Sequence, residues 1–129
     1  MRNVRNDIYT IYKGKEYEVG AMNPDIVSLR SYDPSDVSDG FSLYKGVVYI
    51  KRVHRSELEE IYSITTYAEY EGIKFQAIKE DGDKILLSGV IGDYRVFESL
   101  GMKMVDKGVY EKWVDKSDVT RIYEEKEPL

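Results

Sequence analysis

An internal repeat constrains this chain more than any other feature of its sequence. Residues 45–62 and 107–123 both follow the pattern K-G-V-Y-x-K-x-V-x-[RK]-S-[ED]-[LV]-x-x-I-Y, once Val48 is treated as a one-residue insertion. Nine of the 17 aligned positions are identical. Residues 11–19 and 69–77 agree more weakly, since both contain Tyr-x-Gly with an aromatic residue three positions after the glycine. The repeat predicts a duplicated chain with domains at 1–65 and 66–129.

The length and the lack of cysteine limit how each half can be stabilised. A chain of 129 residues without cysteine has neither disulfides nor thiolate metal ligands. Because about 60 residues is close to the smallest size that folds without such support, each half needs a compact core. The sequence also lacks an apolar run of about 18 residues and an N-terminal hydrophobic stretch, which predicts a cytoplasmic location and no membrane insertion.

The order of turns and alternating segments predicts mainly β structure. A hairpin is expected over 8–19 and a strand over 47–53, whereas 33–40 has the proline, glycine and aspartates of a loop. Ser56 and Ser117 each predict one turn of tight helix that leads into a further strand. The strands expected in the second repeat lie near 66–71, 73–79, 84–88, 94–105 and 109–114.

About five short strands in each half, with a loop in the middle and a one-turn helix before the last strand, resemble the SH3-like small barrel. The resemblance includes the shared ending of the repeats at 53–62 and 114–123. It implies two tandem SH3-like barrels. Neither repeat has the acidic loop, prolines and tyrosines with which SH3 domains hold proline-rich peptides, so that activity is not implied. The alternative fold is an α+β antiparallel sheet with one or two short helices.

Motifs for catalysis and metal binding are missing from the sequence. His54 is the only histidine and its repeat counterpart is Asp115, which indicates an exposed position. Without cysteine, ordinary zinc sites and Cys-His pairs are excluded. The acidic clusters lack the calcium-loop pattern, and no glycine-rich phosphate loop is present. We predict that the chain is not an enzyme and needs no metal and no cofactor.

The charge of the chain bears on its partners. A net charge of -5 and a pI near 5.0 disfavour nucleic acid, because the phosphate backbone requires a basic face. Acidity favours a basic protein partner, although ordinary solubility also accounts for it. Twelve tyrosines fit both strands and protein interfaces. We predict a protein partner, with the chain itself a monomer or a weak dimer.

Seven residues form the predicted binding surface. Period two places Trp113 between Glu111 and Asp115 on the outward face of its strand. An aromatic residue there either packs against the other repeat or contacts a partner. The aspartates of the 33–40 loop are expected to be solvated and to steer the partner's approach. The candidates besides Trp113 are Tyr94, Phe41, Tyr44, Asp33, Asp36 and Asp39.

These observations favour a small non-catalytic protein that binds another protein. The most specific form of this hypothesis is an immunity or antitoxin type of inhibitor, which occludes a basic toxin domain by charge complementarity. The alternative is an accessory or phage-derived regulatory module that binds a peptide or nucleic acid between its two barrels. An unfamiliar enzyme is disfavoured, because side chains of useful catalytic pKa are scarce in this sequence.

Overall fold

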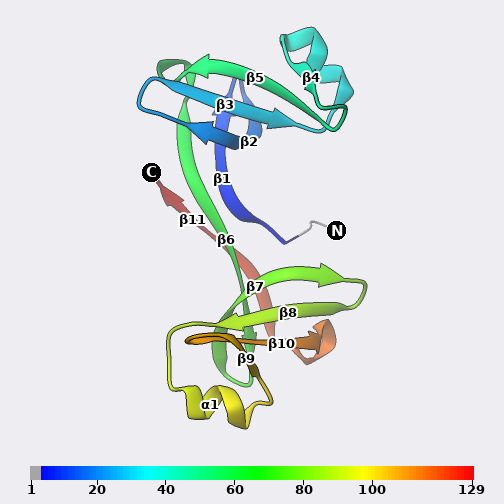
Figure 1. Ribbon diagram of the computed structural model, residues 1–129, viewed down its shortest axis with the longest axis vertical. Helices are drawn as coiled ribbons and strands as arrows, with labels where there is room; N and C mark the ends of the chain where they lie inside the picture. Colours follow the sequence, from blue (N-terminus) through cyan, green and yellow to red (C-terminus); the bar gives the residue numbers. More distant parts are fainter. Residues whose placement is uncertain (1–3) are drawn as a thin grey trace. The chain divides into compact units, whose positions relative to one another are not determined.

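The computed structural model describes residues 4–129 and is mainly β (Figure 1). Eleven strands join through hydrogen bonds into one antiparallel sheet, in the order β4-β5-β3-β2-β1-β6-β7-β8-β10-β9, with β11 beside β6. The chain divides into two compact units. The first unit comprises 7–64 and 126–129, and the second comprises 65–125 with the residues up to Asn6. Residues 1–3, which fall within the predicted range 1–65, lie outside the described residues.

Both units contain the same succession of elements: three strands, a helix, two strands, a single 3-10 turn and a last strand. In the first unit these are β1 Asn6–Tyr12, β2 Lys15–Met22, β3 Ile26–Ser31, η1 Pro34–Asp39, β4 Ser42–Tyr44, β5 Val48–His54, η2 Arg55–Glu57 and the start of β6 Glu60–Tyr70. In the second unit they are the end of β6, β7 Ile73–Asp81, β8 Lys84–Gly89, α1 Tyr94–Ser99, β9 Lys103–Asp106, β10 Val109–Asp115, η3 Lys116–Asp118 and β11 Arg121–Pro128.

The opening hairpins of the two units have the same register. Tyr12 pairs with Lys15 in the first unit, and Tyr70 pairs with Ile73 in the second. The two residues between the paired positions have positive φ, at 50° and 79° in Lys13-Gly14 and at 52° and 75° in Glu71-Gly72. Two-residue turns of this kind match the twist of antiparallel strands, so the Tyr-x-Gly repeat produces the same hairpin twice.

Each unit has its own hydrophobic core on one face of its strands. Along β3, buried residues alternate with partly exposed ones, which places Val27 and Leu29 on the core face. The core of the first unit consists of Tyr12, Tyr17, Val19, Val27, Leu29, Phe41, Val53 and Ile61. The core of the second unit consists of Ala68, Phe75, Ala77, Ile85, Leu87, Phe97, Met102, Tyr110 and Val114.

The predicted SH3-like barrels are not present, although the predicted mainly β class is confirmed. The sheet is open, with β4 at one edge and β9 at the other. A barrel requires the strands of one repeat to close on themselves. Here β6 lies between β1 and β7, so it extends the ladder of strands. The sequence shows that each repeat consists mainly of short strands, but not which strands pair.

Two segments differ from the sequence-based expectation in their local structure. The predicted loop at 33–40 contains the 3-10 helix η1, and the predicted strand at 94–105 contains α1 followed by the short strand β9. In both cases an aspartate caps the helix: the Asp33 side chain accepts from the Ser35 N–H, and the Asp93 side chain accepts from the Arg95 N–H. The predicted tight turns after His54 and Asp115 are confirmed as η2 and η3.

The repeated aliphatic residues do not all have the same burial. Val53 and Val114 are 4% and 5% exposed, as expected for equivalent core positions. Ile61 is 8% exposed, whereas Ile122 is 43% exposed. The repeat alone would give Ile122 the same core position as Ile61, but Ile122 is not in a core, because β11 buries less of its length than β6 does.

Candidate functional site

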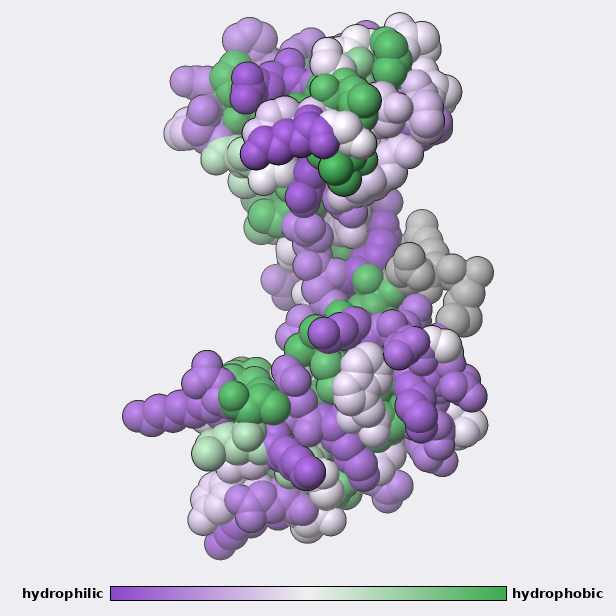
Figure 2. All heavy atoms as spheres, turned by 45° about the vertical axis from the view of Figure 1, so that its right-hand side comes forward, coloured by the Kyte–Doolittle hydropathy of each residue, from purple (hydrophilic) through white to green (hydrophobic). Residues whose placement is uncertain are grey.

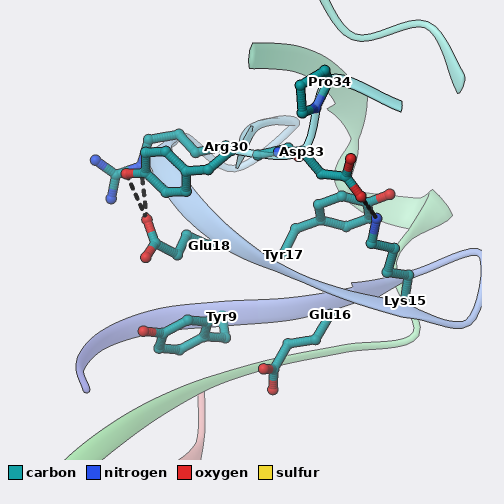
Figure 3. Close-up of a pocket in the computed structure, with 10 residues that line it drawn as sticks. Tyr9, Lys15, Glu16, Tyr17, Glu18, Arg30, Asp33 and Pro34 are labelled. Atoms are coloured by element: carbon teal, nitrogen blue, oxygen red, sulfur yellow. Dashed lines mark hydrogen bonds and ion pairs between the residues drawn. The ribbon is translucent and has the colours of Figure 1, made fainter. Parts of the chain in front are cut away.

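The first unit contains a pocket of about 540 Å³ beside its strands β1, β2 and β3 (Figure 3). Residues of β1, β2 and β3 and of the segment after β3 form its walls. We call it the acidic pocket. The residues that line it are Tyr9, Lys15, Glu16, Tyr17, Glu18, Arg30, Ser31, Tyr32, Asp33 and Pro34.

Strand register brings the charged residues of the acidic pocket together. Glu18 of β2 lies opposite Tyr9 of β1 on one side and opposite Arg30 of β3 on the other. The Arg30 guanidinium lies 3.6 Å from the Glu18 carboxylate and 3.2 Å from that of Asp7. The Tyr32 hydroxyl also donates to Glu18, at 3.3 Å, so the Glu18 carboxylate has two side-chain partners.

A buried aspartate lies behind the wall of this pocket. Asp36 of η1 is only 2% exposed. Its carboxylate accepts hydrogen bonds from Lys15 Nζ at 2.8 Å, from Ser31 Oγ at 2.5 Å and from Tyr17 Oη at 3.3 Å. We call these four residues the Asp36 cluster. It joins β2, β3 and η1, and three of its members also line the acidic pocket.

The Asp36 cluster keeps its carboxylate ionised. Burial alone raises the pKa of Asp36, but the hydrogen bonds from Lys15 and Ser31 outweigh burial and hold this pKa below its usual value. The hydrogen bond to Asp36 in turn raises the pKa of Lys15. Hydrogen bonds from Ser35 lower the pKa of Asp33, which lies at the pocket rim 3.6 Å from Lys15. Near neutral pH the acidic pocket therefore has charged carboxylates.

The second unit has a smaller pocket of about 250 Å³ at the equivalent place. Eight of its lining residues follow those of the acidic pocket at a constant interval of 58 positions. We call it the second pocket. The equivalent pairs are Tyr9 and Tyr67, Glu16 and Lys74, Tyr17 and Phe75, Glu18 and Gln76, Arg30 and Ser88, Ser31 and Gly89, Tyr32 and Val90, and Asp33 and Ile91.

The two pockets share a position but differ in chemistry. Where the acidic pocket has Glu16, the second pocket has Lys74, whose Nζ lies 4.1 Å from the centroid of the Tyr67 ring. Lys74 also forms an ion pair with Glu125 at 2.9 Å. The second pocket thus contains its own cation over an aromatic ring, while the acidic pocket has a carboxylate at the equivalent position.

The Asp36 cluster has an apolar counterpart in the second unit. Ile73, Phe75, Gly89 and Phe97 occupy the positions of Lys15, Tyr17, Ser31 and Asp36. Phe97 packs against Phe75 with ring centroids 5.9 Å apart. A Cβ atom built on Gly89 would lie 2.9 Å from the Phe97 ring, so this ring fills the space that Ser31 uses in the first unit. The shared fold does not require the polar cluster, because the second unit forms without it.

The comparison with known proteins assigns the chain to one family. The family model described as "Uncharacterised conserved protein UCP033725" matches residues 4–129. The chain belongs to this family. No curated protein and no solved structure matches it significantly.

In this member of the UCP033725 family, two of the seven predicted binding residues are buried. Phe41 is 2% exposed and stacks on Tyr17 at 5.0 Å between ring centroids, so it belongs to the core of the first unit. Asp36 is not in a solvated loop, because three side chains from neighbouring strands bind its carboxylate. Both expectations were wrong for one reason: the polar segment 33–40 packs against β2 and β3.

The other predicted residues lie at the surface, where their binding role stays a prediction. Asp33 is exposed and lines the acidic pocket, and Asp39 is exposed at the end of η1. Trp113 is 43% exposed and pairs with Leu86 of β8, on the face away from the core. Tyr44 of β4 and Tyr94 of α1 are 50% and 56% exposed.

The sequence reasoning missed most of the acidic pocket. Tyr9, Glu16, Glu18, Arg30 and Tyr32 were not candidates, because each belongs to an ordinary alternating strand or to its end. A signal was present in the repeat alignment, where Glu16 and Lys74 reverse the charge at equivalent positions. Such a reversal between otherwise similar repeats marks positions at which the two halves have diverged in chemistry.

No metal centre is found in the described part of the chain. Among residues 4–129, no group of three or more His, Asp or Glu side chains is placed to hold a metal ion. No helix in the same range is long and apolar enough to cross a membrane. On the face shown in Figure 2, hydrophobic side chains reach the surface in small groups among hydrophilic ones. The acidic pocket is therefore the site with the most distinctive chemistry.

Proposed function

We propose that the chain is a protein-binding module whose acidic pocket receives a lysine or arginine side chain of its partner. The observation that carries the proposal is the composition of the pocket wall. Three tyrosines, of which Tyr32 alone is exposed, and three carboxylates line it: Tyr9, Tyr17, Tyr32, Glu16, Glu18 and Asp33. Aromatic faces and carboxylates together are the groups that bind a cationic side chain most strongly.

The local charge favours a cation despite the two cationic residues in the wall. Lys15 is paired with Asp36 and Asp33, and Arg30 is paired with Asp7 and Glu18. With Glu16, whose carboxylate accepts a hydrogen bond from Tyr62, five carboxylates in or beside the pocket stand against two cations, an excess of three negative charges. A partly desolvated excess of this sign attracts a basic group and raises its association rate.

The second pocket supplies an internal example of the proposed contact. Its Lys74 ammonium lies over the Tyr67 ring and pairs with a carboxylate. In the acidic pocket the equivalent ring is Tyr9, and the residue equivalent to Lys74 is the carboxylate Glu16. A lysine or arginine from a partner would bring a cation to this place. The Lys74 contact of the second unit supports this proposal, because it holds an ammonium group at the equivalent position of the same fold.

A basic toxin domain is the specific partner that fits this chemistry, and the chain would then act as an immunity or antitoxin type of inhibitor. Binding to an acidic pocket would cover the basic surface that such a domain uses on its substrate. The net charge of -5 supports this form of the proposal, because it steers basic proteins toward the chain.

Short peptides test the proposed contact before any partner is identified. In an NMR titration at low salt, acetyl-Gly-Arg-Gly-amide should shift the backbone signals of residues in β2 and of Tyr32. The citrulline analogue has the same shape without the charge, and we expect it to bind at least about threefold more weakly. Equal binding of the two peptides would show that the pocket does not recognise a cation.

Variants that copy the second pocket provide the matched test. Glu16→Lys and Glu18→Gln introduce the residues found at positions 74 and 76, which the same fold already accommodates. Both should abolish the preference for the arginine peptide. Glu59→Lys makes the same change of charge at an exposed position outside the pocket lining, and it should leave the preference intact. Circular dichroism establishes that each variant is folded.

A further inference from the structure

A second hollow on the first unit, of about 840 Å³, has the opposite charge. It lies across β2, β3, β5 and β4, and we call it the basic groove. Its charged lining residues are Arg30, Lys51 and Arg52, and no carboxylate of residues 4–129 lines it. Such a groove is unexpected in a chain with a net charge of -5.

Strand register places the polar groups of the basic groove on one face. Ser28 of β3 lies opposite Arg52 of β5, and Arg30 lies opposite Ile50. Ser42 of β4 pairs with Ile50 from the other side. Two hydroxyl groups and two guanidinium groups therefore point to the same side of three adjacent strands.

Small residues make the space for this groove. Ala21 pairs with Ser28 and Ser28 pairs with Arg52, whereas Lys79, Leu86 and Trp113 form the equivalent row in the second unit. Gly20 lies in the bulge of β2, where the second unit has Ile78. A Cβ atom at Gly20 would lie 3.1 Å from Cγ of Arg30, so this glycine lets the arginine lie across the strand.

Arg52 is the residue of the groove that is ready to bind an anion. Arg30 is held by Asp7 and Glu18, and Lys51 donates to the Tyr12 hydroxyl and the Asp39 carbonyl. Within residues 4–129 the exposed Arg52 side chain makes neither an ion pair nor a hydrogen bond. A guanidinium group in this state binds a carboxylate through two parallel hydrogen bonds.

We propose that the basic groove holds an Asp or Glu side chain of the same protein partner whose basic side chain enters the acidic pocket. This inference rests on the proposed function. Arg30 lines both hollows, so the two sites are neighbours on one face of the first unit. A polyanion such as nucleic acid fits this face poorly, because the carboxylates of the acidic pocket would repel its other charges. A protein segment with both charges matches the whole face.

The register also sets the spacing of the two partner residues. Glu18, Arg30 and Ile50 form one row across β2, β3 and β5, and Arg52 lies two residues along β5 from Ile50. Two steps between adjacent strands amount to about 10 Å and two residues along a strand to about 7 Å, which puts Arg52 about 12 Å from Glu18. An extended peptide spans this distance with about three to four residues, so the basic and acidic residues of the partner should be about three positions apart.

Four peptides measured against three proteins test the inference. The probes are acetyl-Arg-Gly-Gly-Glu-amide, its Arg-to-citrulline and Glu-to-Gln analogues, and the doubly changed peptide. With the wild type at low salt, replacing Glu by Gln should weaken binding at least about threefold, with signals of Ser28 and Arg52 shifting in NMR titration. With Arg52→Gln, the Glu and Gln peptides should bind equally, whereas Arg55→Gln, outside the groove, should behave as wild type.

Each outcome of the peptide series decides one of the two proposals. If the Glu and Gln peptides bind the wild type equally while citrulline still weakens binding, the acidic pocket stands and the basic groove is overturned. If citrulline has no effect, or no peptide binds, the acidic pocket fails and the groove proposal falls with it. If Arg52→Gln leaves the preference for Glu unchanged, the carboxylate binds elsewhere and the groove is overturned.

Discussion

Asp36 and Phe97 occupy equivalent positions in the two units. The Phe41 N–H donates to the carbonyl of Asp36 at 3.2 Å, and the Met102 N–H donates to the carbonyl of Phe97 at 3.0 Å. One backbone geometry thus carries a buried carboxylate in one unit and a buried ring in the other. Replacing a buried polar cluster by well-packed apolar residues is often neutral or stabilising, so the retention of Asp36 points to a role beside the acidic pocket.

Removal of the Asp36 carboxylate should destabilise the protein. Asp36→Ala leaves Lys15, Ser31 and Tyr17 without their shared acceptor, and we expect the free energy of unfolding to fall by about 1–3 kcal/mol. Urea denaturation at pH 7 measures this change. Asp39→Ala is the matched control, because Asp39 is exposed in the same 3-10 helix. An equal effect of both substitutions would contradict the role given to the cluster.

The second unit also shows which apolar residues could replace the Asp36 cluster and restore the stability lost in Asp36→Ala. A variant with Lys15→Ile, Tyr17→Phe, Ser31→Gly and Asp36→Phe copies its apolar packing into the first unit. This variant should be more stable to urea than Asp36→Ala, because it leaves no buried polar group unpaired. It should still lose binding of the arginine peptide, since three of the four positions line the acidic pocket. A variant less stable than Asp36→Ala would show that the two units do not share this packing.

The stability of the wild type should depend on pH through Asp36. Its native pKa lies below the ordinary value of 3.8, so its stabilising effect is complete above that value and is lost as pH falls through the native pKa. The free energy of unfolding should therefore decline below about pH 4. Asp36→Asn has no proton to gain, and the difference between wild type and variant should shrink as the pH is lowered from about 6 to about 3. A constant difference would argue against a depressed pKa.

Ile61 and Ile122 should respond differently to truncation despite their place in the repeat. Ile61→Ala removes a buried side chain and should cost about 2–5 kcal/mol in the free energy of unfolding. Ile122 is 43% exposed, so Ile122→Ala should cost less than about 1.5 kcal/mol. Denaturation midpoints of the two variants, measured side by side, decide the point.

Substitution of Phe41 should mainly lower stability, whereas substitution of Trp113 should mainly weaken binding. Phe41→Ala should lower the free energy of unfolding by about 3–5 kcal/mol, because its ring is buried. Trp113→Ala should cost less stability, since the side chain is 43% exposed. Once a protein partner is identified, Trp113→Ala should hasten dissociation about tenfold, which corresponds to about 1.4 kcal/mol. An unchanged dissociation rate in surface plasmon resonance would remove Trp113 from the interface.

Several elements could be read from the sequence because their causes are local. The Tyr-x-Gly pattern defines both hairpins, since only two residues separate the paired strands and both adopt positive φ. The tight turns after β5 and β10 follow the repeated serine. The sequence analysis predicts a strand at 94–105 and does not predict the helix α1. The signal for this helix is Asp93, whose side chain caps its first turn.

What the sequence determined by itself is the duplication, the order of most strands and the two opening hairpins, because these depend on residues close together in the chain. Only the tertiary structure decided that the sheet stays open, that Asp36 is buried and that one strand face carries the acidic pocket beside the basic groove. These features depend on which distant strands pair. A carboxylate can be buried only when other groups bind it, and β2 and β3 bring Lys15, Tyr17 and Ser31 to that of Asp36. These partners lie outside 33–40, so no local pattern in that segment could predict the burial.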